Sequence, residues 1–210
     1  NPVSKPLKLF GKPKSRNIRY SQEDLERFYD ACIHLKMRRP GRGVELWKMA
    51  KTLYATGVRR GELLNMEKEH MVTDFAIEIV EPSAKRKSQG DTNEIKSDEP
   101  YIVDLNDEIV SWFQEVKSGK IFPGWTKNSF NHEFKRAARL AGLPDTIPHG
   151  MRHTFAKDLL QTGKVSLAEL QGRLNHKDMK STGVYSKWVR NERSRDSVNA
   201  LIRPQILKVV

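Results

Sequence analysis

Residues 55–63 read Ala-Thr-Gly-Val-Arg-Arg-Gly-Glu-Leu, and this stretch decides how the middle of the 210-residue chain folds. It closes a segment, 44–55, whose apolar residues recur at helical spacing, and Gly57 is a typical helix stop. A short helix over 62–66 is expected to follow. The junction therefore puts two adjacent arginines, the first of them Arg59, between two helices, where such a pair is most often a surface feature.

The chain changes character before this junction, at Ser21. Residues 1–20 hold lysines, arginines and prolines but no acidic residue, which predicts an extended basic arm that lies along phosphates or serves as a solvated linker. The run 21–24, Ser-Gln-Glu-Asp, resembles a helix N-cap with acids in the first turn. Apolar residues follow at helical spacing, namely Leu25, Phe28, Tyr29 and Cys32. We expect the folded domain to begin at Ser21.

After the junction the apolar period changes to alternation. Residues 75–80 and 101–105 each alternate apolar and polar side chains, which predicts two strands. The segment between them, 81–100, is polar, rich in charge and too long for a tight hairpin. We therefore expect a mobile loop there.

The remainder of the chain is again helical in pattern. Helices are expected near 108–117, 128–141, 151–161 and 167–174, and 166–169 is a plausible capping box for the last of them. The sequence thus predicts a fold that is mainly α with a small antiparallel β-sheet (α+β).

Composition narrows the class of protein. The chain holds 38 Lys and Arg against 26 Asp and Glu, a formal net charge of +12, which favours an anionic partner such as nucleic acid. Its length favours one domain over two. The single cysteine, Cys32, excludes an intramolecular disulfide and a multi-thiolate metal site. No stretch approaches the ~20 apolar residues of a membrane span, and no signal peptide is visible. We expect a cytoplasmic protein.

Four motifs occur in a specific order, although each alone is weak. The stretch 55–63 is followed by Pro-His-Gly-Met-Arg-His-Thr-Phe at 148–155, then Leu-Asn-His at 174–176. Tyr185 lies nine residues beyond the last histidine (185 − 176 = 9). Together, over roughly residues 21–188, they resemble the catalytic domain of the tyrosine recombinases, the phage integrase family. Leu-Asn-His departs from the family's usual Leu-Gly-His, although Asn tolerates a left-handed backbone.

The resemblance implies roles for five residues. Arg59 and Arg152 would bind the non-bridging oxygens of a scissile DNA phosphate, which suits their permanent charge and forked geometry. Tyr185 would attack phosphorus to form a 3′-phosphotyrosine, and a phenol with a pKa of about 10 needs a neighbouring base or cation to do so. His149 and His176 would handle protons and hydrogen bonds. Which of the two accepts the phenolic proton stays open.

Other assignments depend on the same resemblance. The family carries a lysine general acid on the loop between the second and third strands of its sheet, and Lys85, Lys87 and Lys96 compete for that role. Lys85 is preferred because it lies nearest the end of the first predicted strand. Glu62 is either a buried partner of the site or an exposed acid on a helix face. His153 is expected to point elsewhere on its helix and to be structural.

The function implied is that of a site-specific DNA recombinase or integrase of bacterial or phage origin, nucleoid-associated in use. It would cleave and rejoin duplex DNA without metal, nucleotide or other cofactor, as a homo-oligomer on paired sites, and the resemblance implies a tetramer. A type IB topoisomerase and a catalytically inactive basic DNA-binding module are the alternatives. Residues 1–20 would end a missing N-terminal DNA-binding domain. The tail, 189–210, contains an apolar set made of Val198, Leu201 and Ile202. Through this set the tail would either pack onto an adjacent protomer or fold back on its own domain.

Overall fold

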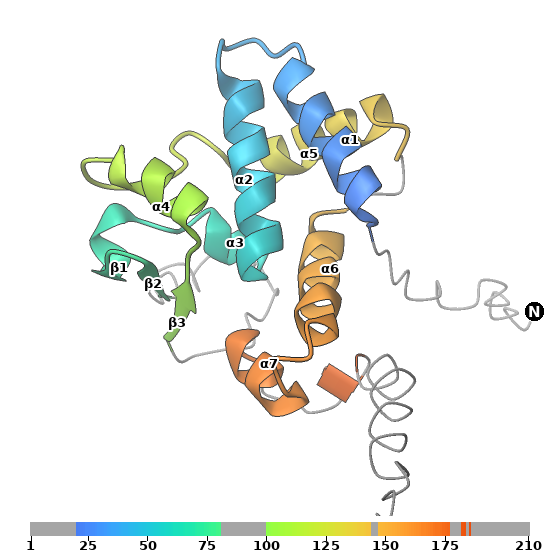
Figure 1. The fold of residues 1–210 in the computed structure, drawn as a ribbon. Helices are drawn as coiled ribbons and strands as arrows, with labels where there is room; N and C mark the ends of the chain where they lie inside the picture. The colour runs from blue at the N-terminus through green and yellow to red at the C-terminus, as the bar shows by residue number, and fades with distance from the viewer. Residues whose placement is uncertain (1–19, 81–99, 144–146, 177–181, 184, 186–210) are drawn as a thin grey trace, which may run out of the picture.

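The computed structural model describes residues 20–80, 100–143, 147–176, 182–183 and 185. Within them it confirms the expected class, because helices dominate and one small antiparallel sheet accompanies them (Figure 1). The predictions for residues 1–19 of the basic arm, for the three candidate lysines between residues 81 and 99 and for the C-terminal tail lie outside the described residues. Tyr20, the last residue of the predicted arm, belongs instead to the folded domain, because its side chain is buried in the core.

The helices match the expected segments to within a few residues. They are α1 (Gln22–His34), α2 (Arg42–Thr56), α3 (Arg60–Leu63), α4 (Asp107–Gln114), α5 (Lys127–Leu140), α6 (Pro148–Gln161) and α7 (Leu167–Arg173), with a 3-10 turn, η1 (Lys68–His70). The short helix α3 lies earlier than the predicted 62–66. The cause is Glu62, whose carboxylate accepts a hydrogen bond from the backbone N–H of Arg59 and starts the helix directly after that residue.

Capping boxes begin two of the helices as the sequence predicts. At α1 the hydroxyl of Ser21 accepts from the backbone N–H of Asp24 at 3.1 Å, and the Asp24 carboxylate accepts from the N–H of Ser21 at 3.0 Å. That second hydrogen bond lowers the pKa of Asp24. Ser166 and Glu169 make the same exchange at α7. Each box satisfies backbone donors that a helix N-terminus otherwise leaves unpaired.

The sheet has three strands rather than the predicted two. In the order β1 (Met71–Thr73), β2 (Ala76–Ile79) and β3 (Tyr101–Asp104), all neighbours are antiparallel. In the β2–β3 register Ile77 lies opposite Val103, and both side chains face the core. The strand β1 was missed because it has only three residues and is mostly exposed, so it shows no alternation.

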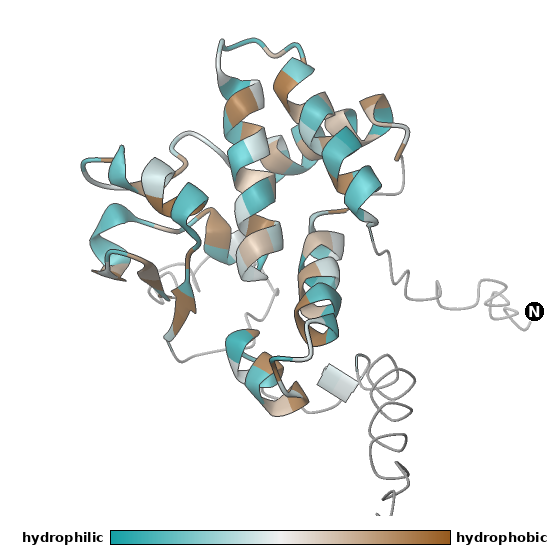
Figure 2. Cartoon of the chain, in the orientation of Figure 1, coloured by the Kyte–Doolittle hydropathy of each residue, from teal (hydrophilic) through white to brown (hydrophobic). Residues whose placement is uncertain are grey.

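Helix α2 is the centre of the molecule and packs against α1 and α6. The sheet and α4 lie on one side of it, α6 lies on the other, and α7 lies below the C-terminal end of α2 (Figure 1). Apolar residues gather on the inward helix faces (Figure 2). Cys32 is fully buried, as expected, and burial raises the pKa of its thiol. Among the described residues no helix has both the length and the apolar character to cross a bilayer.

Candidate active site

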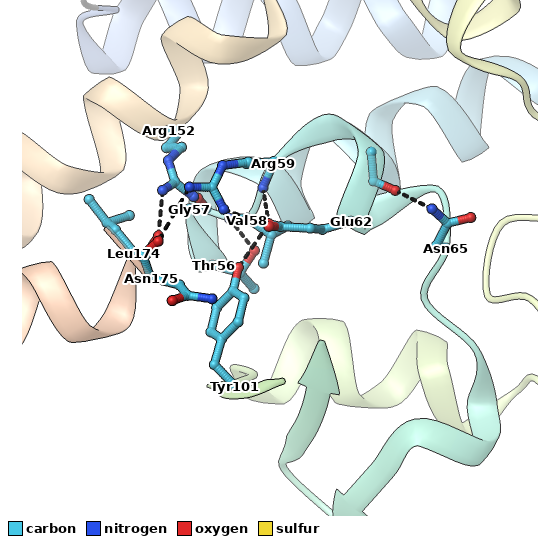
Figure 3. A network of polar contacts seen from close by, with 11 residues as sticks. Thr56, Gly57, Val58, Arg59, Glu62, Asn65, Tyr101, Arg152, Leu174 and Asn175 are labelled. Atoms are coloured by element: carbon cyan, nitrogen blue, oxygen red, sulfur yellow. Dashed lines mark hydrogen bonds and ion pairs between the residues drawn. The ribbon is translucent and has the colours of Figure 1, made fainter. Parts of the chain in front are cut away.

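The junction quoted at the outset is held against α6. Gly57 caps α2 with a left-handed backbone (φ 67°), which glycine adopts without strain. A Cβ atom at this position would collide with the ring of Phe155 on α6. The close approach brings the backbone that carries Arg59 next to the helix that carries Arg152, and Figure 3 shows the two guanidinium groups side by side.

Arg59 is positioned by Glu62 and remains partly open to solvent. Its Nη1 donates to Oε1 of Glu62 at 2.8 Å, and its Nη2 donates to the carbonyl of Asn175 at 3.3 Å. The hydroxyl of Tyr101 on β3 donates to Oε2 of the same carboxylate at 2.8 Å (Figure 3). The side chain of Glu62 is 13% exposed and that of Arg59 is 34% exposed. Of the two interpretations of Glu62, the structure therefore supports the buried partner.

Arg152 lies almost entirely inside the protein. Only 2% of the residue is exposed, and its guanidinium spans two backbone carbonyls: Nη1 donates to Gly57 at 2.6 Å and Nη2 to Leu174 at 2.5 Å (Figure 3). Burial lowers the pKa of Arg152, and the like charge of Arg59 adds to that effect. One side chain thus ties together three of the four sequence motifs.

The Leu-Asn-His turn keeps the backbone shape that glycine would favour. Asn175 has a φ of 47°, and it is the one non-glycine residue with a positive φ within the described part of the chain. Short polar side chains such as Asn tolerate this region. The turn presents His176, whose Nδ1 lies 3.0 Å from the hydroxyl oxygen of Thr182. Burial first, and then the charges of Arg152 and Arg59, lower the pKa of His176 to about 4.

His149 lies in the first turn of α6, directly after Pro148. Burial first, and then the charges of His153, Arg152 and Arg59, lower its pKa to about 4. The imidazole is therefore neutral at pH 7 and can accept a proton.

Tyr185 is buried, with 5% of the residue exposed, among Ala156, Leu160, Leu170 and Leu174. Its hydroxyl oxygen lies 2.6 Å from Nδ1 of His153. Burial raises the pKa of Tyr185, and the charge of Arg152 opposes that rise.

The expectation that His153 points away from the site is therefore wrong. Its ring lies 4.5 Å from that of His149, centroid to centroid, in an edge-to-face arrangement. Residues four apart share one face of a helix, and 149 and 153 are four apart. This spacing, visible in the sequence, is the signal that identifies His153 as a site residue.

Comparison with known proteins agrees with this geometry. The model of the phage integrase family matches residues 19–191. The chain belongs to the phage integrase family. It is 30% identical over 147 residues to the tyrosine recombinase XerD of Shewanella oneidensis, covering 66% of this chain and 47% of that protein. The chain spans about half the length of the curated relatives that it matches.

Solved structures of other proteins share the fold. The catalytic domain of bacteriophage HP1 integrase has a TM-score of 0.60 at 21% identity, with 89% of this chain and 97% of that one covered. The XerH site-specific recombinase bound to its difH substrate has a TM-score of 0.59 at 20% identity, covering 80% and 49%. At this level of identity the likeness establishes a common architecture.

Five of the six residues predicted from the phage integrase resemblance come together in the structure. Arg152 bonds to the backbone of Gly57 and Leu174, which lie two residues before Arg59 and His176 respectively. His153 contacts both the ring of His149 and the hydroxyl of Tyr185. The sixth, Lys85, lies outside the described residues. Among the described residues no three His, Cys, Asp or Glu side chains are arranged to hold a metal ion.

Proposed function

We propose that this chain is the catalytic part of a site-specific DNA recombinase that cleaves and rejoins duplex DNA through a 3′-phosphotyrosine on Tyr185. The observation that carries the proposal is geometric. Arg152 holds the backbone on which Arg59 and His176 lie, through the carbonyls of Gly57 and Leu174, and His153 links the ring of His149 at 4.5 Å to the hydroxyl of Tyr185 at 2.6 Å. The relatives named as tyrosine recombinases support it, as does XerH, which was solved bound to its DNA substrate.

The charge arrangement suits a phosphodiester. Arg59 lies close enough to Arg152 to disfavour the charge of Arg152, and an anionic phosphate between them relieves that repulsion. The carboxylate of Glu62 balances part of the charge on Arg59, while about a third of the Arg59 side chain stays exposed. A phosphate therefore meets a preorganised pair of cationic groups rather than two free surface arginines.

The chemical step balances within the protein and the DNA. The Tyr185 oxygen bonds to phosphorus and the bond from phosphorus to the 5′ oxygen breaks. The phenolic proton goes to a neutral imidazole of the site, His149 or His176, and Lys85 protonates the departing oxygen. The phosphotyrosine keeps the energy of the broken bond, so a free 5′ hydroxyl can attack it and reverse the step without nucleotide hydrolysis. In the proposed reaction the nucleophile, the base and the acid are all side chains of the protein.

The described state of Tyr185 is a resting one. Its hydroxyl donates to His153 when the neutral imidazole carries its proton on Nε2, and the residue is almost inaccessible. DNA binding must therefore bring the hydroxyl away from His153 and toward the two arginines before cleavage.

The wider assembly is part of the same proposal. The protein acts on two DNA sites as a homo-oligomer, a tetramer in the complete reaction. Residues 1–19 lie along the DNA backbone and residues 189–210 pack on an adjacent protomer. It works in the cytoplasm, on nucleoid or phage DNA. The formal net charge of +12 supports a DNA partner.

A covalent trapping experiment tests the function. The protein is incubated with a pool of nicked duplexes of randomised sequence, in which a cleaved end diffuses away, and adducts are separated in denaturing gels. A covalent adduct that disappears in Tyr185→Phe is the expected result, with Tyr54→Phe as a control tyrosine outside the site. An adduct that survives Tyr185→Phe rejects the mechanism. DNA binding without any adduct indicates an inactive module, and plasmid relaxation by a monomer indicates a topoisomerase.

A further inference from the structure

The N-terminus of α6 is held by Tyr20, a residue that lies 127 positions earlier in the sequence than Ile147. Its N-cap residue is Ile147, whose side chain has no polar atom to cap with. The hydroxyl of Tyr20 pairs instead with the backbone of Ile147 itself, since it accepts from the N–H of Ile147 at 3.0 Å and donates to the carbonyl of Ile147 at 3.1 Å. Tyr20 precedes the N-cap of α1 and is only 3% exposed.

Tyr20 also contacts the next turns of α6. A Cβ atom on Gly150 would collide with the ring and hydroxyl of Tyr20, so the absence of a side chain at 150 makes room for it. The backbone N–H of Tyr20 donates to the hydroxyl of Thr154 at 3.1 Å, and that hydroxyl donates to the carbonyl of Gly150 at 2.9 Å. Three successive points of α6 are thus held by one residue.

We propose that Tyr20 is a positioning residue that sets the place of His149 and Arg152 by clamping the first turns of α6. Both site residues lie between the clamped positions: His149 between Ile147 and Gly150, and Arg152 between Gly150 and Thr154. A displacement of about 1 Å at a reacting centre costs up to about 100-fold in rate. The consequence for catalysis rests on the proposed function, whereas the placement of His149 does not.

Tyr20→Phe is the decisive variant, because it removes both hydroxyl hydrogen bonds and keeps the ring. Tyr54→Phe is its matched control. The hydroxyl of Tyr54 donates to Asp158 on the C-terminal half of the same helix at 2.9 Å and accepts from Gln22 at 3.1 Å. Each variant therefore loses the hydroxyl hydrogen bonds described, which for Tyr20 both join Ile147 at the start of α6 and for Tyr54 join Asp158 on α6 and Gln22 on α1.

Two readouts separate positioning from stability. The first is the titration of the His149 imidazole by NMR, which needs no DNA; we expect a shifted midpoint and ring signal in Tyr20→Phe and in Gly150→Ala, and none in Tyr54→Phe. The second is the rate of covalent adduct formation at saturating DNA, which we expect Tyr20→Phe to lower by about 10- to 100-fold with unchanged DNA affinity.

Each outcome of the two measurements either supports or overturns the positioning role of Tyr20. An unchanged His149 titration in Tyr20→Phe overturns the proposal, and so does an equal change in Tyr54→Phe, which would reflect general loosening of α6. If the wild-type protein forms no adduct, the proposed function fails, yet the NMR titration still tests the clamp. A slower adduct rate that is explained entirely by weaker DNA binding also overturns the positioning role.

Discussion

Replacing Arg152 by alanine should unfold the protein at a much lower temperature, in addition to any effect on DNA cleavage. The guanidinium is 2% exposed and bridges the carbonyls of Gly57 and Leu174 at 2.6 and 2.5 Å. These carbonyls end two separate segments, the C-cap of α2 and that of α7. Without the guanidinium, both acceptors lose their charged donor and the two segments lose their direct link.

The magnitude follows from the contacts. A hydrogen bond from a charged donor contributes about 1.5–3 kcal/mol, so two of them set an upper range of about 3–6 kcal/mol. Removing a buried cation regains part of its desolvation cost, the same cost that lowers the pKa of Arg152. We expect a net loss of about 3 kcal/mol in the free energy of unfolding. For a domain of this size that is a decrease in Tm of about 6–12 °C.

Thermal unfolding followed by circular dichroism measures the effect, with Arg173→Ala as the control. Arg173 pairs with Asp104 at 3.1 Å, but the two side chains are 49% and 61% exposed, and such surface pairs contribute about 0–1 kcal/mol. Arg152→Lys should lie between the two, because lysine keeps the charge without the fork. If Arg152→Ala melts within about 2 °C of the wild type, the structural role of this arginine is refuted.

Three further outcomes are expected. His153→Phe should make Tyr185 several-fold more reactive to tetranitromethane, quantified by peptide mass spectrometry, because the hydroxyl loses its partner; unchanged nitration would mean that His153 does not restrain it. Asn175→Ala should cost about 1 kcal/mol in urea unfolding while Asn175→Gly is neutral or stabilising, since only the alanine opposes the positive φ; the reverse order contradicts this explanation. Stability should fall as the pH drops from about 6.5 toward 4, because the folded pKa of His149 and of His176 is about 4 and the unfolded chain therefore binds more protons in this range. A urea titration at several pH values should show this slope reduced in the double variant His149→Gln/His176→Gln, and an unchanged slope would locate it elsewhere.

Local sequence features predicted much of the architecture. Ser21 and Ser166 mark helix starts because capping is decided within four residues, and Gly57 marks a helix end because a left-handed backbone favours glycine. The strand β1 escaped prediction because three mostly exposed residues carry no period. The start of α3 was misplaced because it depends on a side chain, Glu62, that caps from inside the helix.

The sequence by itself determined the helical class, the basic balance and the order of the motifs that carry Arg59, Arg152, the histidines and Tyr185. Only the tertiary structure decided how these groups are held: Arg152 inside the protein on two carbonyls, Tyr185 against His153, and the start of α6 under Tyr20. The reason is physical. Capping and periodicity act over a few residues, whereas a hydrogen bond such as that of Tyr20 to Ile147 joins groups 127 residues apart, which only the packed chain brings within reach.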